Sequence, residues 1–232
     1  MICHKGITMD TTSIRIWDLP IRIFHWTLVA SIGFAWFTAE TGGNWMEWHE
    51  RTGIFILSLV IWRIIWGFVG SDTARFTQFL KSPFYALHHV QEMRQQATAY
   101  HAGHNPLGAW MVIALLAMIL VQGMTGLFAT DDIATEGPLA HLVSSSTSET
   151  LTRLHHLGFN IIMILASIHV AAVLFYRFAK HTNLIKPMVL GTADWPNAQQ
   201  PQPEKLQFKA AWIGLVLWVG VYSVLNLILT VL

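Results

Sequence analysis

The stretch that decides the fold class is Leu154–Tyr176, with the sequence LHHLGFNIIMILASIHVAAVLFY. It contains no Lys, Arg, Asp or Glu. It is long enough to cross a bilayer, for which a helix needs about 20 mostly apolar residues. It nevertheless contains several histidines, and ionisable residues inside a membrane span are costly and usually functional. The stretch therefore predicts a membrane-spanning helix whose histidines have a specific task.

Four further apolar stretches are Ile23–Ala39, Thr52–Gly70, Pro106–Ala129 and Ala210–Leu232, and the only charged residue among them is Arg63. Of the 232 residues, 53% are hydrophobic and 12% are charged, whereas a soluble domain has about 25% charged residues. A transmembrane barrel would instead show alternating strands of about 10 residues. We therefore expect an all-α integral membrane protein, with a four-helix transmembrane bundle and a fifth, C-terminal transmembrane helix.

The composition also excludes several other classes of protein. The hydrophobic content is too high for a disordered chain, and a single cysteine, Cys3, cannot build a disulfide scaffold. The net charge of +1 does not favour nucleic-acid binding, which requires a basic face. We expect the lipid bilayer, and no nucleic acid, among the partners of this chain.

The distribution of lysine and arginine predicts the orientation in the membrane. These residues concentrate in the N-terminal segment, between the second and third spans, and between the fourth and fifth spans. The two remaining loops hold only Arg51 and Arg153, beside several acidic residues. Because cytoplasmic loops carry an excess of Lys and Arg, we expect the N-terminus in the cytoplasm and the C-terminus on the periplasmic side.

His155 and His169 lie on one face of the fourth span. Their spacing of fourteen residues comes within about 40° of whole helical turns and separates them by about 21 Å along the axis. His156 would point about 140° away from His169, so His155 is the better partner. One histidine is therefore expected near each side of the membrane.

Two more histidines match these depths. Span one runs outward from His25, and span two runs inward from His49. The depth argument therefore pairs His49 with His155 on the outer side and His25 with His169 on the inner side. Two stacked imidazole pairs inside a helical bundle are the arrangement expected for two bis-histidine haems. The haem would be b-type, because covalent attachment needs a Cys-x-x-Cys-His motif.

Two rival interpretations remain in view. One is a cofactor-free membrane transporter or anchor, although a transporter of metal ions or protons usually has acidic residues in its spans and none occurs here. The other is a membrane oxidoreductase acting on a small species such as superoxide at the outer haem. The histidines outside the spans are expected to be solvated or interfacial; they are His4, His88, His89, His101, His104, His141 and His181.

Arg63 and Gly53 are candidate supporting residues for the haems. Arg63 lies toward the inner end of span two, where it would pair with an anionic haem propionate or snorkel to the headgroups. Gly53 follows His49 by one turn and would either give a porphyrin clearance or serve helix packing.

Several motifs together resemble one known family. They are WDLPIRIFHW at Trp17–Trp26, HERTG at His49–Gly53, RIIWGFVG at Arg63–Gly70, GHNPLG at Gly103–Gly108, and the histidine pair of span four with Asn160 between its members. Over roughly residues 14–190 the chain resembles the bacterial cytochrome b561 and nickel-hydrogenase cytochrome b family. The resemblance implies that His25, His49, His155 and His169 are the axial ligands of two haem b groups.

The resemblance further implies electron transfer in a respiratory chain of the bacterial inner membrane. The expected partners are quinone or quinol and a periplasmic redox protein such as a c-type cytochrome. The chain would act as an electron-transfer protein, alone or as the cytochrome b subunit of a larger oxidoreductase. We expect a di-haem domain at residues 1–190, a cytoplasmic linker at 191–207 and the additional helix at 208–232.

Overall fold

The computed structural model describes residues 11–82, 84–85, 103–131, 135–196 and 205–232. Its long helices are α1 (Leu19–Thr41), α2 (Met46–Val69), α5 (Pro106–Gly126), α6 (Ser145–Phe178) and α8 (Ala211–Val231). The shorter elements are β1 (Thr11–Arg15), η1 (Gly43–Trp45), η2 (Asp72–Ala74), α3 (Phe76–Phe79), η3 (Ala140–Leu142), α7 (Ile185–Leu190) and β2 (Thr192–Pro196). The predicted, mainly helical architecture is confirmed.

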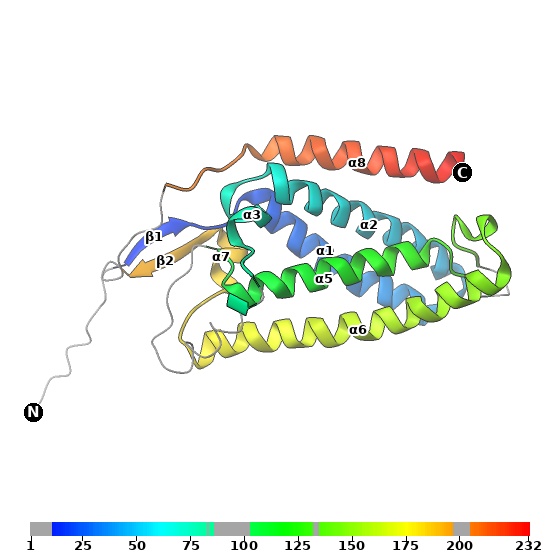
Figure 1. The fold of residues 1–232 in the computed structure, drawn as a ribbon, viewed down its shortest axis with the longest axis horizontal. Coiled ribbons are helices and arrows are strands. Elements are labelled where there is room, and N and C mark those ends of the chain that lie inside the picture. The colour runs from blue at the N-terminus through cyan, green and yellow to red at the C-terminus, as the bar shows by residue number, and fades with distance from the viewer. Residues whose placement is uncertain (1–10, 83, 86–102, 132–134, 197–204) are drawn as a thin grey trace, which may run out of the picture.

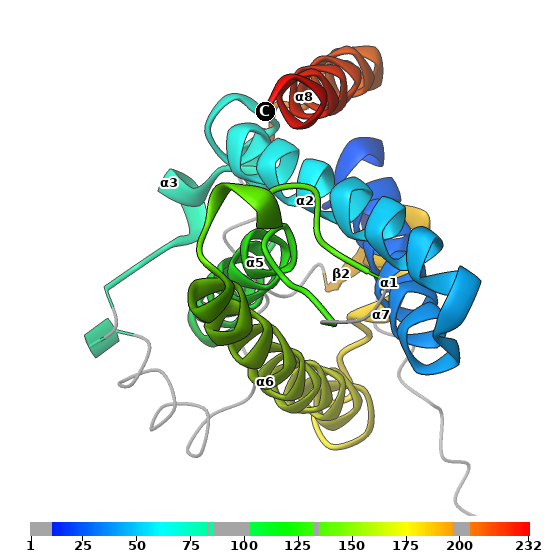
Figure 2. The ribbon, with the colours of Figure 1, turned by 90° about the vertical axis from the view of Figure 1, so that its right-hand side faces the viewer.

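The long helices lie lengthwise beside one another in a bundle (Figure 1). Helix α2 is the central element, since it packs against α1, α5 and α8, while α6 packs against α5. Viewed from one end, α8 lies on the outside of α2, and α6 lies across the bundle from α1 (Figure 2). The large, fully buried apolar side chains Leu57, Val60 and Trp66 accordingly belong to α2.

Four of the described helices are long and apolar enough to cross a membrane. They are α2 together with η1 (Gly43–Val69), and α5, α6 and α8. Helix α1 is not among them. The prediction of five spans, with Ile23–Ala39 of α1 as the first, therefore stays a prediction.

A two-stranded sheet lies at one end of the bundle. β1 and β2 pair antiparallel, with Ser13 opposite Asp194 in the register, and we call this end the sheet end (Figure 1). The sheet is an addition to the expected all-α fold, and β2 lies within the segment 191–207 that was expected to be a linker. Gly191 adopts a φ of +87° after α7, and its carbonyl accepts hydrogen bonds from the backbone of Ile16 and Trp17.

The starts of the helices follow from local capping. The side chain of Asp18 accepts a hydrogen bond from the backbone of Ile21 at 2.8 Å, and that of Asn105 accepts one from Gly108 at 2.7 Å. Both helices have a proline in the first turn, where its missing N–H costs nothing. These caps fix where α1 and α5 begin, and so fix the positions of the histidines beside them.

Candidate functional site

His49 of α2 and His155 of α6 face each other near the end of the bundle opposite the sheet. Their ring centroids lie 6.1 Å apart, and the ring planes are nearly perpendicular at 84°. The two residues are far apart in the sequence, and they meet because α2 and α6 both begin at this end. We call them the far pair.

Backbone carbonyls fix the tautomers of both far-pair histidines. Nδ1 of His49 lies 2.8 Å from the carbonyl oxygen of Ala35, and Nδ1 of His155 lies 2.9 Å from that of Gln122. A carbonyl oxygen only accepts, so Nδ1 is the protonated donor in each ring. The lone pair of each imidazole is therefore on Nε2, as required of a histidine that binds a metal through that atom.

A cavity of about 460 Å³ surrounds the far pair. This volume lies within the range of about 300–1,000 Å³ that is usual for ligand and cofactor sites. Gly53 lines the cavity, and no described atom lies within 4 Å of the position that a Cβ would take there. Gly53 thus faces the cavity and does not pack closely against another helix.

Gly126 is a functional candidate that the sequence reasoning missed. A Cβ at this position would lie 2.8 Å from Cε1 of His155, which is closer than real Cβ atoms approach another atom. Gly126 on α5 therefore leaves the space that the His155 ring occupies. Its only signal in the sequence is a Gly-x-x-Gly spacing with Gly123, which indicates close helix packing without identifying the partner.

His25 of α1 and His169 of α6 form a second pair, toward the sheet end. Their ring centroids are 6.5 Å apart, and the ring planes are inclined at 51°. The ring of His25 also contacts the Trp26 indole edge-on at 5.0 Å. Nδ1 of His25 is buried and has no hydrogen-bond partner among the described residues. We call these two residues the sheet-end pair.

Arg63 is buried, with 3% of its surface exposed. Its Nη2 donates to the carbonyl of Ala74 at 3.1 Å, and its guanidinium lies 4.9 Å from the centre of the Phe76 ring. Its Nη1 is buried without a partner in the described part of the chain. The side chain is thus held inside the protein, near the sheet end.

His104 departs from its expected position. A solvated loop histidine was expected, but the ring lies between Trp17 at 4.7 Å and Phe79 at 4.6 Å. Desolvation of the ring, with Arg63 nearby, lowers the pKa of His104 to about 3, so the imidazole is neutral. The sequence around it does not reveal this burial, because Trp17 and Phe79 approach it only through tertiary packing.

His156 also borders the cavity of the far pair. Its ring centroid is 6.4 Å from that of His155, at an interplanar angle of 76°. The sequence analysis expected His156 to face elsewhere or to support its neighbour. The structure places it on the cavity wall, beside the His155 ring.

The geometry of the two pairs fits a metal held between two imidazoles. With each metal–nitrogen bond about 2.0–2.1 Å long, the two ring centroids would be separated by about 6 Å, close to both observed values. Within the described ranges, no group of three or more His, Cys, Asp or Glu residues is arranged to hold a metal ion. Two protein ligands per metal suit a haem iron, whose macrocycle supplies the remaining four.

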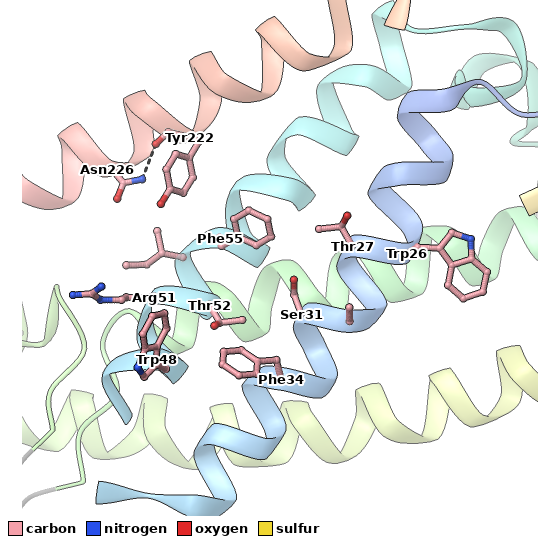
Figure 3. Close-up of a pocket in the computed structure, with 12 residues that line it drawn as sticks. Trp26, Thr27, Ser31, Phe34, Trp48, Arg51, Thr52, Phe55, Tyr222 and Asn226 are labelled. Carbon is pink, nitrogen blue, oxygen red and sulfur yellow. Dashed lines mark hydrogen bonds between the residues drawn. The ribbon is translucent and has the colours of Figure 1, made fainter. Parts of the chain in front are cut away.

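A second cavity, of about 960 Å³, lies on another face of the bundle. It is lined by α1, α2 and α8, with Phe34, Phe55 and Tyr222 among its walls (Figure 3). None of the four paired histidines lines it. Residues of α2 thus border both cavities: His49 and Gly53 border one, and Thr52 borders the other.

Comparison with known proteins agrees with this site. The sequence profile of the prokaryotic cytochrome b561 family matches residues 16–191, which include all four paired histidines. A probable Ni/Fe-hydrogenase B-type cytochrome subunit from Rhizobium leguminosarum bv. viciae is 23% identical over 221 residues, covering 81% of this chain and 92% of the relative. A protein of the same description from Rhodobacter capsulatus is 24% identical over 213 residues, covering 78% and 81%. No solved structure matches the chain.

The matched segment covers most of the chain, from the end of β1 to the end of α7, and leaves α8 outside. Together with the helices that are long and apolar enough to cross a bilayer, it identifies a multi-pass membrane protein of electron transport. The chain belongs to the prokaryotic cytochrome b561 family of b-type cytochromes, whose cofactor is haem b.

Proposed function

We propose that this chain is a di-haem cytochrome that carries electrons between the quinone pool and a periplasmic redox partner. His49 and His155 hold one haem, and His25 and His169 hold the other. The observation that carries the proposal is the presence of two facing imidazole pairs at 6.1 and 6.5 Å within one bundle. Each pair combines α6 with a different helix, so both sites depend on the same fold.

The histidines suit electron transfer better than substrate chemistry. A haem iron whose two axial positions are both taken by imidazole exchanges electrons and leaves no open position for a substrate. The carbonyls of Ala35 and Gln122 orient the far-pair rings, and such hydrogen bonds also make the ligand nitrogen more basic. Backbone groups of α1 and α5 thus orient the two rings of the far pair.

Arg63 and Gly53 have supporting roles in this proposal. Arg63 supplies a buried positive charge near the sheet-end pair, suited to a haem propionate. Gly53 borders the cavity of the far pair, where a side chain would occupy space that a porphyrin needs. Both residues would therefore affect haem content or potential without being ligands to iron.

The orientation is also a proposal, supported by charge. The segments at the sheet end carry many basic residues, among them Arg15, Arg75, Lys180, Lys186 and Lys209. We place the sheet end in the cytoplasm of a bacterial inner membrane. The chain's described C-terminus lies at the opposite end (Figure 1), which is then periplasmic.

The relatives support a protein partner for the chain. Both are described as probable B-type cytochrome subunits of a Ni/Fe hydrogenase, so each is the cytochrome component of a larger redox enzyme. By analogy, this chain would exchange electrons at its far end with a periplasmic redox protein, such as a c-type cytochrome or the catalytic part of an oxidoreductase.

Haem stoichiometry tests the proposal directly. The pyridine haemochrome assay on purified protein should give two haem b per chain. His49→Ala and His25→Ala should each lose one haem and retain the other, whereas His141→Ala, at an exposed position outside both pairs, should keep two. One haem in the unmodified protein, or two in either ligand variant, would contradict the ligand assignment.

A further inference from the structure

The sheet end holds a group of polar atoms that lack partners. Nδ1 of His104, Nη1 of Arg63 and Nδ1 of His25 are all buried without a hydrogen-bond partner in the described part of the chain. The ring of His104 packs against Phe79, and Phe79 packs against Phe76 with ring centroids 5.7 Å apart. The Arg63 guanidinium lies over that same Phe76 ring, so His104 and Arg63 line one part of the sheet end. Buried polar groups are normally hydrogen-bonded in a working protein, so this group is suited to a ligand.

The chemistry of the unpaired atoms indicates an anionic ligand. An arginine offers only donors, and a neutral histidine offers one N–H. The acidic group that acts on Arg63 is Asp18. The carboxylate oxygens of Asp18 accept from the backbone N–H of Ile21 and from the indole N–H of Trp66 at 3.1 Å, and neither is a hydrogen-bond partner of the buried Arg63 Nη1. A carboxylate from outside the chain would complement the two donors.

Both donors are also held in place by other residues of the chain. The ring of His104 is fixed between Trp17 and Phe79. The Arg63 guanidinium is fixed by the carbonyl of Ala74 and the ring of Phe76. Because both side chains are already immobilised, they lose little conformational entropy when a ligand binds. They can therefore act together as one binding site.

We propose that His104, together with Arg63, binds a propionate carboxylate of the haem that His25 and His169 hold. The assignment rests on the proposed function, since it requires a haem at the sheet-end pair. It adds His104 to the residues that position this haem. His104 would donate one N–H to the carboxylate, while Arg63 supplies the compensating charge.

The consequence is electrostatic. A hydrogen bond from His104 withdraws negative charge from the carboxylate, and a carboxylate that keeps more of its charge disfavours adding an electron to the iron beside it. Removing the His104 donor should therefore shift the reduction potential of the sheet-end haem downward. A tenfold change in the ratio of reduced to oxidised haem corresponds to about 59 mV for a one-electron couple, and we expect a shift of this order.

The test uses three variants in a background where only one haem remains. His49→Ala removes the far-pair haem, so the absorption bands report the sheet-end haem alone. In that background, His104→Phe should lower the midpoint potential, and His104→Gln, which keeps a donor, should restore most of it. His141→Phe serves as the control and should leave the potential unchanged. An unchanged potential with His104→Phe would overturn the proposal.

A modified cofactor tests whether His104 acts on the potential through the haem propionate or through packing. Apoprotein is reconstituted with the dimethyl ester of iron protoporphyrin, which has no carboxylates. With this ester, the His104→Phe variant and the chain that retains His104 should have the same midpoint potential. An equal shift with the ester would mean that His104 acts through packing, and the proposal would fail.

Two further measurements keep the outcomes distinct. In the His49→Ala background, His25→Ala should lose the remaining haem. If it does not, the ligand assignment is wrong, and this failure is distinguished from failure of the His104 proposal. His104→Gln should bind haem normally even if the phenylalanine variant folds poorly.

Discussion

The contacts of the two rings distinguish His155 from His156 as the proposed haem ligand. His155 and His156 are neighbours in the sequence and both border the far cavity. Only His155 faces His49 at 6.1 Å, and its Nδ1 donates to Gln122. We therefore expect His155→Ala to lose one of the two haems and His156→Ala to retain both, as measured by the haemochrome assay on matched preparations. Haem loss in the His156 variant alone would reverse the ligand assignment on α6.

Gly53 provides a second prediction at the residue scale. Leucine there would extend into the cavity beside His49, where no described atom lies near the added Cβ. Because leucine favours helix more than glycine does, the apoprotein should fold at least as well. We expect Gly53→Leu to reduce haem content to about one per chain.

The control for Gly53 is Gly33 on α1. It also has open space around its Cβ position, but it does not line the far cavity. Gly33→Leu should therefore keep two haems. If Gly53→Leu also kept two haems with unchanged spectra, Gly53 would not contribute clearance for a porphyrin.

At the scale of elements, the apolar runs predicted the helices well but not their full lengths. Helix α6 begins at Ser145, nine residues before the apolar run at Leu154. Its polar first turns are helical because the Ser144 side chain caps them. Hydropathy detects only the part of a helix that is apolar. A helix that extends past the membrane therefore looks shorter in the sequence than it is.

The small sheet and the burial of His104 could not be predicted from local sequence. β1 and β2 are separated by most of the chain, and each is only five residues long, too short for a reliable periodic signal. The surroundings of His104 come from Trp17 and Phe79, which approach it only through the fold. In contrast, the pairing of four histidines could be predicted, because helical spacing gives the shared face of His155 and His169, and the direction of each span gives the depths of His25 and His49.

Helix α8 is attached to the bundle by specific contacts. The indole N–H of Trp62 donates to the carbonyl of Gly214 at 2.8 Å, and that of Trp218 donates to the Ser58 hydroxyl at 3.2 Å. A Cβ on Gly214 would lie 3.0 Å from the side chain of Pro20, so the missing side chain lets α8 lie close to α1 at this position.

Gly214→Leu should therefore destabilise the docking of α8. Overpacking of this kind typically costs about 1–3 kcal/mol, which we expect as a lower thermal midpoint in detergent, followed by tryptophan fluorescence. Gly220→Leu, at a position with open space around it, should leave the midpoint unchanged. Equal midpoints for the two variants would mean that the Gly214 contact does not hold α8 in place.

At the scale of the whole molecule, α6 connects the two histidine pairs. His155 and His169 belong to one continuous helix, which places them about 21 Å apart along its axis. In the proposed function, this single helix would hold two haems at fixed depths. If the sheet end is cytoplasmic, an electron that crosses the membrane must visit both centres, and the far pair is the one that meets a periplasmic partner.

His49→Ala separates the two ends of this path. The variant loses a ligand of the far pair only, and the sheet-end pair lies on α1 and α6, away from the substituted residue. We expect the remaining haem to be present at one per chain and reducible by quinol in membrane vesicles. Electron transfer to an added periplasmic acceptor, such as a soluble c-type cytochrome, should fall by at least tenfold, because no centre remains near the far end. If the variant reduced the acceptor at the unmodified rate, electrons would leave the protein without passing the far pair, and the transmembrane path proposed for this chain would be wrong.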